Sequence, residues 1–143
     1  MDTENLTVPG NLDSLKAVRE FVKRATGSAG IDKQRAYKLT LAVDEILANI
    51  VIHGYDEAGR SGDVEISYHV EEDRLRVDLY DCGIPYDPTQ NDTPAHLDKQ
   101  LEDRPIGGLG VYLARQGTDD FIYEFVNDRN HNTFIVNRAA NGS

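Results

Sequence analysis

The stretch "AVDEILANIVIHGY", residues 42–55, decides how the rest of the chain is interpreted. Apolar residues surround nearly the whole helix that it predicts, yet Glu45 and Asn49 interrupt them four residues apart. Residues at that spacing project from the same face of a helix. The pair has two interpretations: a solvated helix face, or partly buried polar groups that would hold a metal ion or accept a hydroxyl proton.

His53 follows Asn49 by four residues and continues the same stripe of the helix. It could influence Glu45 or position a water molecule. It could equally interact with the dipole at the end of the helix, which requires no chemistry. Asp32 predicts the start of this helix as its N-cap, and Gly54 predicts its end.

The remaining segments show helical or strand periodicity in an order that indicates the fold class. Helices packed on one face of a mixed, mostly antiparallel sheet form a two-layer α/β (α+β) sandwich, which is the natural class for this order. The expected helices span about 12–25, 32–53 and 109–116, and the expected strands span 6–8, 64–70, 75–80, 120–125 and 133–136.

Length and composition predict one domain over residues 1–143. A formal net charge of −10 argues against nucleic acid as the main partner, because phosphate backbones require Lys and Arg. No apolar run approaches the roughly 20 residues of a membrane span. Cys82 is the single cysteine, so no intramolecular disulfide is possible, and a cytoplasmic location is the simplest expectation.

Residues 84–106 show no convincing period and contain four of the five prolines. A gap of this length is unusual inside a compact domain and is often functional. We therefore expect a lid over a binding site in this segment.

Two further motifs flank the expected lid. Asp81-Cys82-Gly83 ends a predicted strand, and could form an ordinary turn or a carboxylate that accepts a hydrogen bond from an amine. Gly107-Gly108-Leu109-Gly110 precedes a predicted helix, and could form a loop or a phosphate cradle at a helix N-terminus. Each signal is weak alone, but the three motifs together and in this order are far more specific.

Together, these three motifs resemble those of a known family. Residues 42–55 resemble the asparagine box of the ATP-binding (Bergerat, or GHKL) fold that gyrase-type and histidine-kinase ATPases share. "VDLYDCGIPYDP" (77–88) and "IGGLGVYLAR" (106–115) resemble its two glycine boxes. The likeness covers roughly residues 6–138 and is greatest to the small, stand-alone anti-sigma-factor serine/threonine kinases.

The resemblance implies roles for the polar residues of these motifs. Asn49 matches the asparagine that coordinates the magnesium ion bridging the phosphates of ATP. Glu45 matches the carboxylate that acts as general base toward a hydroxyl group or water. Asp81 matches the aspartate that accepts a hydrogen bond from the adenine amino group.

The resemblance also implies roles for small residues. Gly83 lies where the family backbone nears adenine, and Gly108 and Gly110 match the glycines that hold the phosphates. Thr133 matches the threonine near the adenine, although here it follows Asn132 rather than glycine. Arg104 stands further from the second glycine box than the polar residue of many relatives, and no role is assigned to it.

The function implied by the resemblance is that of an ATP-binding serine/threonine protein kinase that uses Mg²⁺. Such a kinase acts as an anti-sigma-type regulator: it binds a sigma factor and phosphorylates a small antagonist protein, the anti-anti-sigma factor. Relatives of this type are often homodimers. The alternative is a non-catalytic switch of the same fold, in which bound nucleotide only sets the shape of a partner surface.

Overall fold

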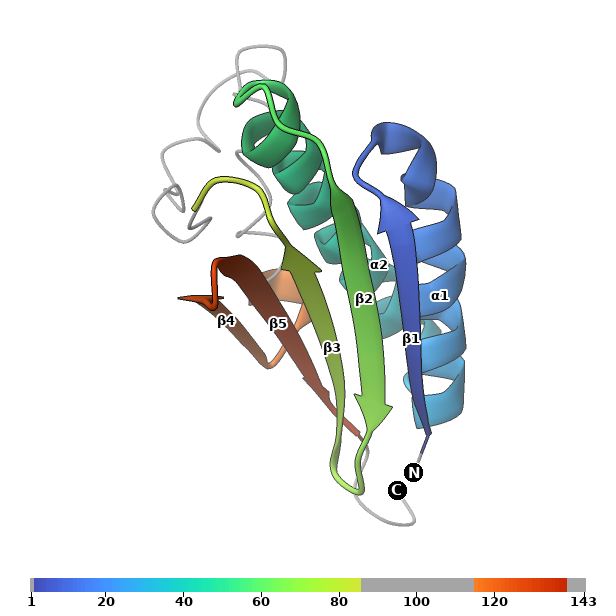
Figure 1. Cartoon of the computed structure of the whole chain (residues 1–143). Coiled ribbons are helices and arrows are strands. Elements are labelled where there is room, and N and C mark those ends of the chain that lie inside the picture. Colours follow the sequence, from blue (N-terminus) through green and yellow to red (C-terminus); the bar gives the residue numbers. More distant parts are fainter. Residues whose placement is uncertain (1, 86–114, 139–143) are drawn as a thin grey trace, which may run out of the picture.

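The computed structural model describes residues 2–85 and 115–138, which form a five-stranded sheet with helices on one face (Figure 1). The elements are β1 (Thr3–Pro9), the 3-10 turn η1 (Leu12–Ser14), α1 (Leu15–Ala29), α2 (Lys33–Asn49), the π-helix η2 (Ile50–Asp56), β2 (Asp63–Val70), β3 (Arg74–Asp81), β4 (Asp120–Val126) and β5 (Arg129–Asn137). The predicted two-layer α/β class is confirmed.

The strand order is β1-β2-β3-β5-β4, and every pairing between the described strands is antiparallel. Strands β4 and β5 form a hairpin whose two linking residues, Asn127 and Asp128, have φ angles of 56° and 60°. Asparagine and aspartate tolerate this left-handed backbone better than most residues, so a two-residue turn replaces the four-residue connection expected from the sequence. Because β5 lies between β3 and β4, Asp81 pairs with Asn130.

The first helix is longer than its sequence pattern indicates. α1 continues through Gly27 and ends only at Gly30, whose φ of 70° is left-handed. The Gly30 and Ile31 N–H groups donate to the Gly27 and Thr26 carbonyls, which satisfies carbonyl groups of the last turn. The expected end near Ala25 is therefore wrong by about one turn.

The second helix begins as expected and ends differently. The Asp32 side chain accepts a hydrogen bond from the Arg35 N–H and caps α2. The expected stop at Gly54 is wrong, because the chain continues as the π-helix η2 to Asp56. Hydrogen bonds from Glu57 N–H to the Ile52 carbonyl and from Arg60 N–H to the Tyr55 carbonyl, both five residues apart, continue this wider winding.

The core lies between the helices and the sheet face that they cover. Phe21 of α1 packs edge-on against Tyr68 of β2, with 5.2 Å between the ring centroids. Burial of each large apolar side chain contributes about 1.5–3 kcal/mol, so this layer supplies most of the favourable free energy of folding. Its fully buried members include Val18, Phe21, Val22, Leu39, Val43, Leu47, Val64, Ile66, Tyr68, Leu75, Val77, Leu79 and Phe134.

Several sequence expectations fall outside the described residues. They include the predicted lid beyond residue 85 and most of the predicted helix at 109–116, of which residues 115–117 are described as helical. Within residues 2–85 and 115–138, no helix is both long enough and apolar enough to cross a bilayer.

Two glycines, one in the last turn of α1 and one directly after it, allow a matched test of how the helix ends. A Cβ added at either Gly27 or Gly30 would meet no atom within 4 Å, so only the backbone conformation distinguishes them. We expect Gly27→Ala to raise the free energy of unfolding by about 0.5–1 kcal/mol, because alanine favours a helix interior. We expect Gly30→Ala to lower it by about 1 kcal/mol, because φ there is left-handed. Urea unfolding measures both changes, and shifts of the same sign would contradict this view of the helix end.

Candidate functional site

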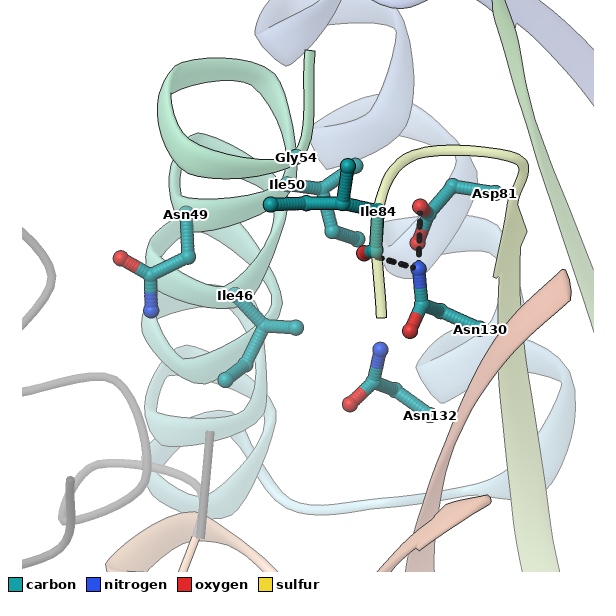
Figure 2. Close-up of a pocket in the computed structure, with 8 residues that line it drawn as sticks. All are labelled: Ile46, Asn49, Ile50, Gly54, Asp81, Ile84, Asn130 and Asn132. Atoms are coloured by element: carbon teal, nitrogen blue, oxygen red, sulfur yellow. Dashed lines mark hydrogen bonds between the residues drawn. The ribbon is translucent and has the colours of Figure 1, made fainter. Parts of the chain in front are cut away.

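A pocket lies between the end of α2, the π-helix η2 and the neighbouring ends of β3 and β5 (Figure 2). The space between these elements is partly open to solvent. Asn49 lies on its helical side, and Asp81, Asn130 and Asn132 lie on its sheet side. The lining residues are Ile46, Asn49, Ile50, Gly54, Asp81, Ile84, Asn130 and Asn132.

Asp81 is the most constrained polar group of the pocket. Its side chain is at the end of β3 and the residue is only 1% exposed. Oδ1 accepts hydrogen bonds of 2.9 Å from the Gly83 N–H and from Asn130 Nδ2. Burial raises the pKa of this carboxyl group, and the two hydrogen bonds partly oppose the rise.

The second carboxylate oxygen of Asp81, Oδ2, does not receive hydrogen bonds of this kind from the described residues. Among the described residues, no donor lies within hydrogen-bond distance of Asp81 Oδ2, although this atom is buried. A buried acceptor without a donor destabilises a protein by about 1–3 kcal/mol. A ligand that brings an N–H group into the pocket would remove this cost.

Two asparagines of β5 complete the sheet side, and the sequence motifs did not identify them as site residues. Asn130 Nδ2 donates to Asp81 Oδ1 and to the Ile84 carbonyl, each at 2.9 Å, and its Oδ1 accepts from the Tyr123 hydroxyl. Asn132 is 2% exposed, and its Oδ1 also lacks a donor among the described residues. Alternation places residues 130 and 132 on one face, but only the pairing of β3 with β5 shows that Asp81 shares it.

Thr133 does not join the pocket. Neighbouring residues of a strand point to opposite faces of the sheet, so Thr133 faces away from the side that Asn132 faces. Its hydroxyl donates to Asp78 Oδ1 at 3.0 Å, beside His131. The structure therefore puts the predicted adenine-binding threonine on the sheet face opposite the helices.

Gly83 lies next to the pocket but does not line it. Its N–H orients the Asp81 carboxylate, and a Cβ at this position would stand 2.7 Å from the Gly54 carbonyl oxygen. The structure thus explains this glycine by close packing against η2. The predicted approach of a ligand to its backbone is a separate matter that stays a prediction.

Asn49 and Glu45 occupy the last two turns of α2. Asn49 is 2% exposed and lines the pocket, but in Figure 2 its carboxamide is directed away from Asp81, so the two groups would contact different parts of one ligand. Glu45 is about half-buried and is not among the lining residues. Burial raises the pKa of the Glu45 carboxyl group, and the neighbouring Asp44 adds to the rise.

Of the remaining sequence candidates, His53 does not line this pocket, and the others lie outside the described residues. His53 Nδ1 lies 2.6 Å from Glu57 Oε1, within and just after the π-helix. Gly108, Gly110 and Arg104 lie outside the described residues. In the described part of the chain, no group of three or more His, Cys, Asp or Glu side chains is arranged to hold a metal ion.

Known proteins are similar to this chain over most of its length. Residues 8–136 match the model of the histidine kinase-like ATPase domain. The chain is similar to proteins named serine-protein kinase RsbW. It is 31% identical to that of Bacillus subtilis, over 99% of this chain and 88% of the relative, and 30% identical to that of Halalkalibacterium halodurans, over 78% and 69%. For the Listeria innocua protein the identity is 28%, over 83% and 77%.

The family match covers the helix that carries Asn49, the strand that ends in Asp81 and the hairpin that supplies Asn130. These are the elements that enclose the pocket, so family membership and pocket geometry concern the same part of the molecule. The chain therefore belongs to the histidine kinase-like ATPase domain family.

Proposed function

We propose that this protein is an ATP-binding serine/threonine protein kinase that acts as an anti-sigma-type regulator and phosphorylates a small antagonist protein. One observation carries the proposal: Asn49 and Asp81, distant in sequence, line the same pocket, and Asp81 keeps a buried oxygen without a donor among the described residues. The similarity to proteins named serine-protein kinase RsbW supports the type of reaction.

The sheet side of the pocket suits the base of an adenine nucleotide. Asp81 Oδ2 can accept a hydrogen bond from an exocyclic amino group, and the Asn132 carboxamide offers both a donor and an acceptor. Ile46, Ile50 and Ile84 supply apolar surface for a flat ring. A guanine base would instead direct a carbonyl oxygen at a carboxylate, so we expect the pocket to prefer adenine.

The helical side suits the phosphates and their metal ion. Mg²⁺ prefers oxygen ligands and usually keeps water and phosphate oxygens in its coordination shell, so one amide oxygen from Asn49 is a sufficient protein contribution. In our proposal, bound Mg·ATP supplies the phosphoryl group, and Gly108 and Gly110 contribute backbone N–H groups to the phosphates. Thr133 keeps no direct contact with the base in this proposal.

Glu45 is proposed as the general base that takes the proton from the substrate hydroxyl group. A carboxylate whose pKa is raised toward neutral pH by burial is a better proton acceptor than an ordinary glutamate. Its position one turn before Asn49 would hold it near the reacting phosphate end of the nucleotide rather than near the base.

The proposed partners are a sigma factor and its anti-anti-sigma antagonist, and we also propose that the protein forms a homodimer in the cytoplasm. The alternative is a non-catalytic switch that binds nucleotide and changes its affinity for a partner. The absence of Glu45 from the pocket lining, within the described residues, is the observation that favours this alternative.

Transfer of labelled phosphate distinguishes the two functions. A candidate antagonist, recovered from extract of the source cells by pull-down with ATP, is incubated with the protein and γ-labelled ATP. We expect transfer by the wild type and a loss of about 100-fold or more in Glu45→Gln, because a general base typically contributes that much. Glu20→Gln, an exposed change on α1, is the control. Normal ATP binding without any transfer by the wild type would leave only the switch.

Asp81→Asn tests the base contact and the cost of the buried carboxylate together. Because the pKa of Asp81 is raised in the folded state, the folded protein binds more protons than the unfolded chain above the ordinary value of 3.8, and stability falls as the pH rises through the raised pKa. We expect ligand-free Asp81→Asn to melt a few degrees above the wild type at about pH 7.5, and the difference to disappear at about pH 4.

The same variant should bind ATP at least about tenfold more weakly, because an amide presents its N–H group where the adenine amino group also donates. Thermal unfolding at the two pH values and titration calorimetry with Mg·ATP measure these effects. A variant that is less stable at neutral pH and binds ATP normally would remove Asp81 from the proposed site.

A further inference from the structure

Tyr55 connects the helical side of the pocket to the sheet side. It lies near the end of the π-helix η2 and is only 1% exposed. Its hydroxyl oxygen accepts a hydrogen bond of 2.9 Å from the Cys82 N–H and donates one of 2.8 Å to the Asp63 carbonyl. Cys82 directly follows Asp81, so one buried hydroxyl group holds the backbone beside the carboxylate that faces the pocket.

Gly54, the residue before Tyr55, holds the same segment of backbone at Ile84, the residue after Gly83. The Gly54 carbonyl accepts a hydrogen bond of 3.2 Å from the Ile84 N–H. Gly83 packs so closely that a Cβ there would stand 2.7 Å from the Gly54 oxygen. Two consecutive residues of η2 therefore fix the bend from Cys82 to Ile84.

Glycines at two other positions fix the ring of Tyr55. A Cβ at Gly10 would stand 2.6 Å from ring atom Cε2, and a Cβ at Gly62 would stand 3.3 Å from the hydroxyl oxygen. The Gly10 N–H donates to the Gly62 carbonyl at 2.8 Å, which keeps these two backbones together. The ring is therefore packed tightly between the end of β1 and the start of β2. Its hydroxyl group cannot move unless these strands move as well.

We propose that Tyr55 is a positioning residue for nucleotide recognition: its hydroxyl group fixes the Cys82 backbone so that Asp81 presents its free oxygen to the base. This inference rests on the proposed ATP-binding function. The π-helix starts directly after Asn49, so the same seven residues connect the proposed metal-binding end of α2 to the proposed base-binding end of β3. The wide winding of η2 carries Tyr55 to the bend after β3, where its hydroxyl group meets Cys82.

Tyr68 provides a matched control inside the same molecule. It is also 1% exposed, and its hydroxyl group donates to Glu4 on β1. It does not line the pocket, and its hydroxyl group contacts β1 rather than the bend after Asp81. Burial raises the pKa of both tyrosines, so both hydroxyl groups stay neutral at physiological pH. Removal of either hydroxyl group leaves an aromatic ring in the core, and only one of the two changes touches the site.

The experiment compares Tyr55→Phe, Tyr68→Phe and the wild type by titration with Mg·ATP and Mg·GTP at a temperature at which circular dichroism shows each protein folded. We expect Tyr55→Phe to weaken ATP binding by about tenfold with little effect on GTP, so that the preference for ATP falls by the same factor. We expect Tyr68→Phe to keep the wild-type preference. Partial unfolding would weaken both nucleotides equally and leave the preference unchanged.

The outcomes separate this inference from the function on which it rests. A wild type that prefers ATP, together with a Tyr55→Phe protein that keeps the full preference, would overturn the positioning role alone. A wild type without any preference for ATP would overturn both. If Tyr55→Phe is unfolded at the assay temperature, the comparison is made in the Gly27→Ala background, in which we expect greater stability.

Discussion

The pairing of β3 with β5 is the constraint on which the site depends. It places Asn130 opposite Asp81, 49 residues earlier in the chain, and joins them by a hydrogen bond of 2.9 Å between Asn130 Nδ2 and Asp81 Oδ1. The same amide group donates to the Ile84 carbonyl, so the strand pairing also fixes the bend that follows β3. Without this pairing, a carboxylate at the end of β3 would have no reason to be buried.

A cost in stability accompanies this arrangement. Burial of a carboxylate is unfavourable unless its oxygens are hydrogen-bonded, and the described residues satisfy only one oxygen of Asp81. Proteins accept such a cost where a ligand removes it, and binding then stabilises the folded state. The conversion of α2 into the π-helix η2 directly after Asn49 fits the same account, because π-helical turns are often found at functional sites.

Sequence periodicity predicted the helices, the strands and their layering, because the buried face of each element is apolar at regular spacing. The motif around Asp81 predicted a carboxylate at a strand end, and the structure has it there. Asn130 and Asn132 could not be identified in this way, because strand register depends on tertiary packing rather than on local pattern. The same dependence applies to Thr133: a shift of one residue along β5 exchanges the two faces of the sheet, so a match by residue type alone cannot show on which face Thr133 lies.

Gly54 was expected to end the helix because glycine marks many helix ends, but the chain continues as η2. A Cβ at Gly54 would make only ordinary contacts, at 3.8 Å, with Asp81 and with Gly83 in the bend after β3. That bend also carries Cys82, the single cysteine of the chain, whose side chain is exposed while its N–H is held by Tyr55. A thiol-reactive fluorophore would therefore attach at one position only, directly after Asp81 and two residues before Ile84, both of which line the pocket. The native sequence thus offers a built-in labelling point from which occupancy of the pocket can be followed in real time by emission intensity.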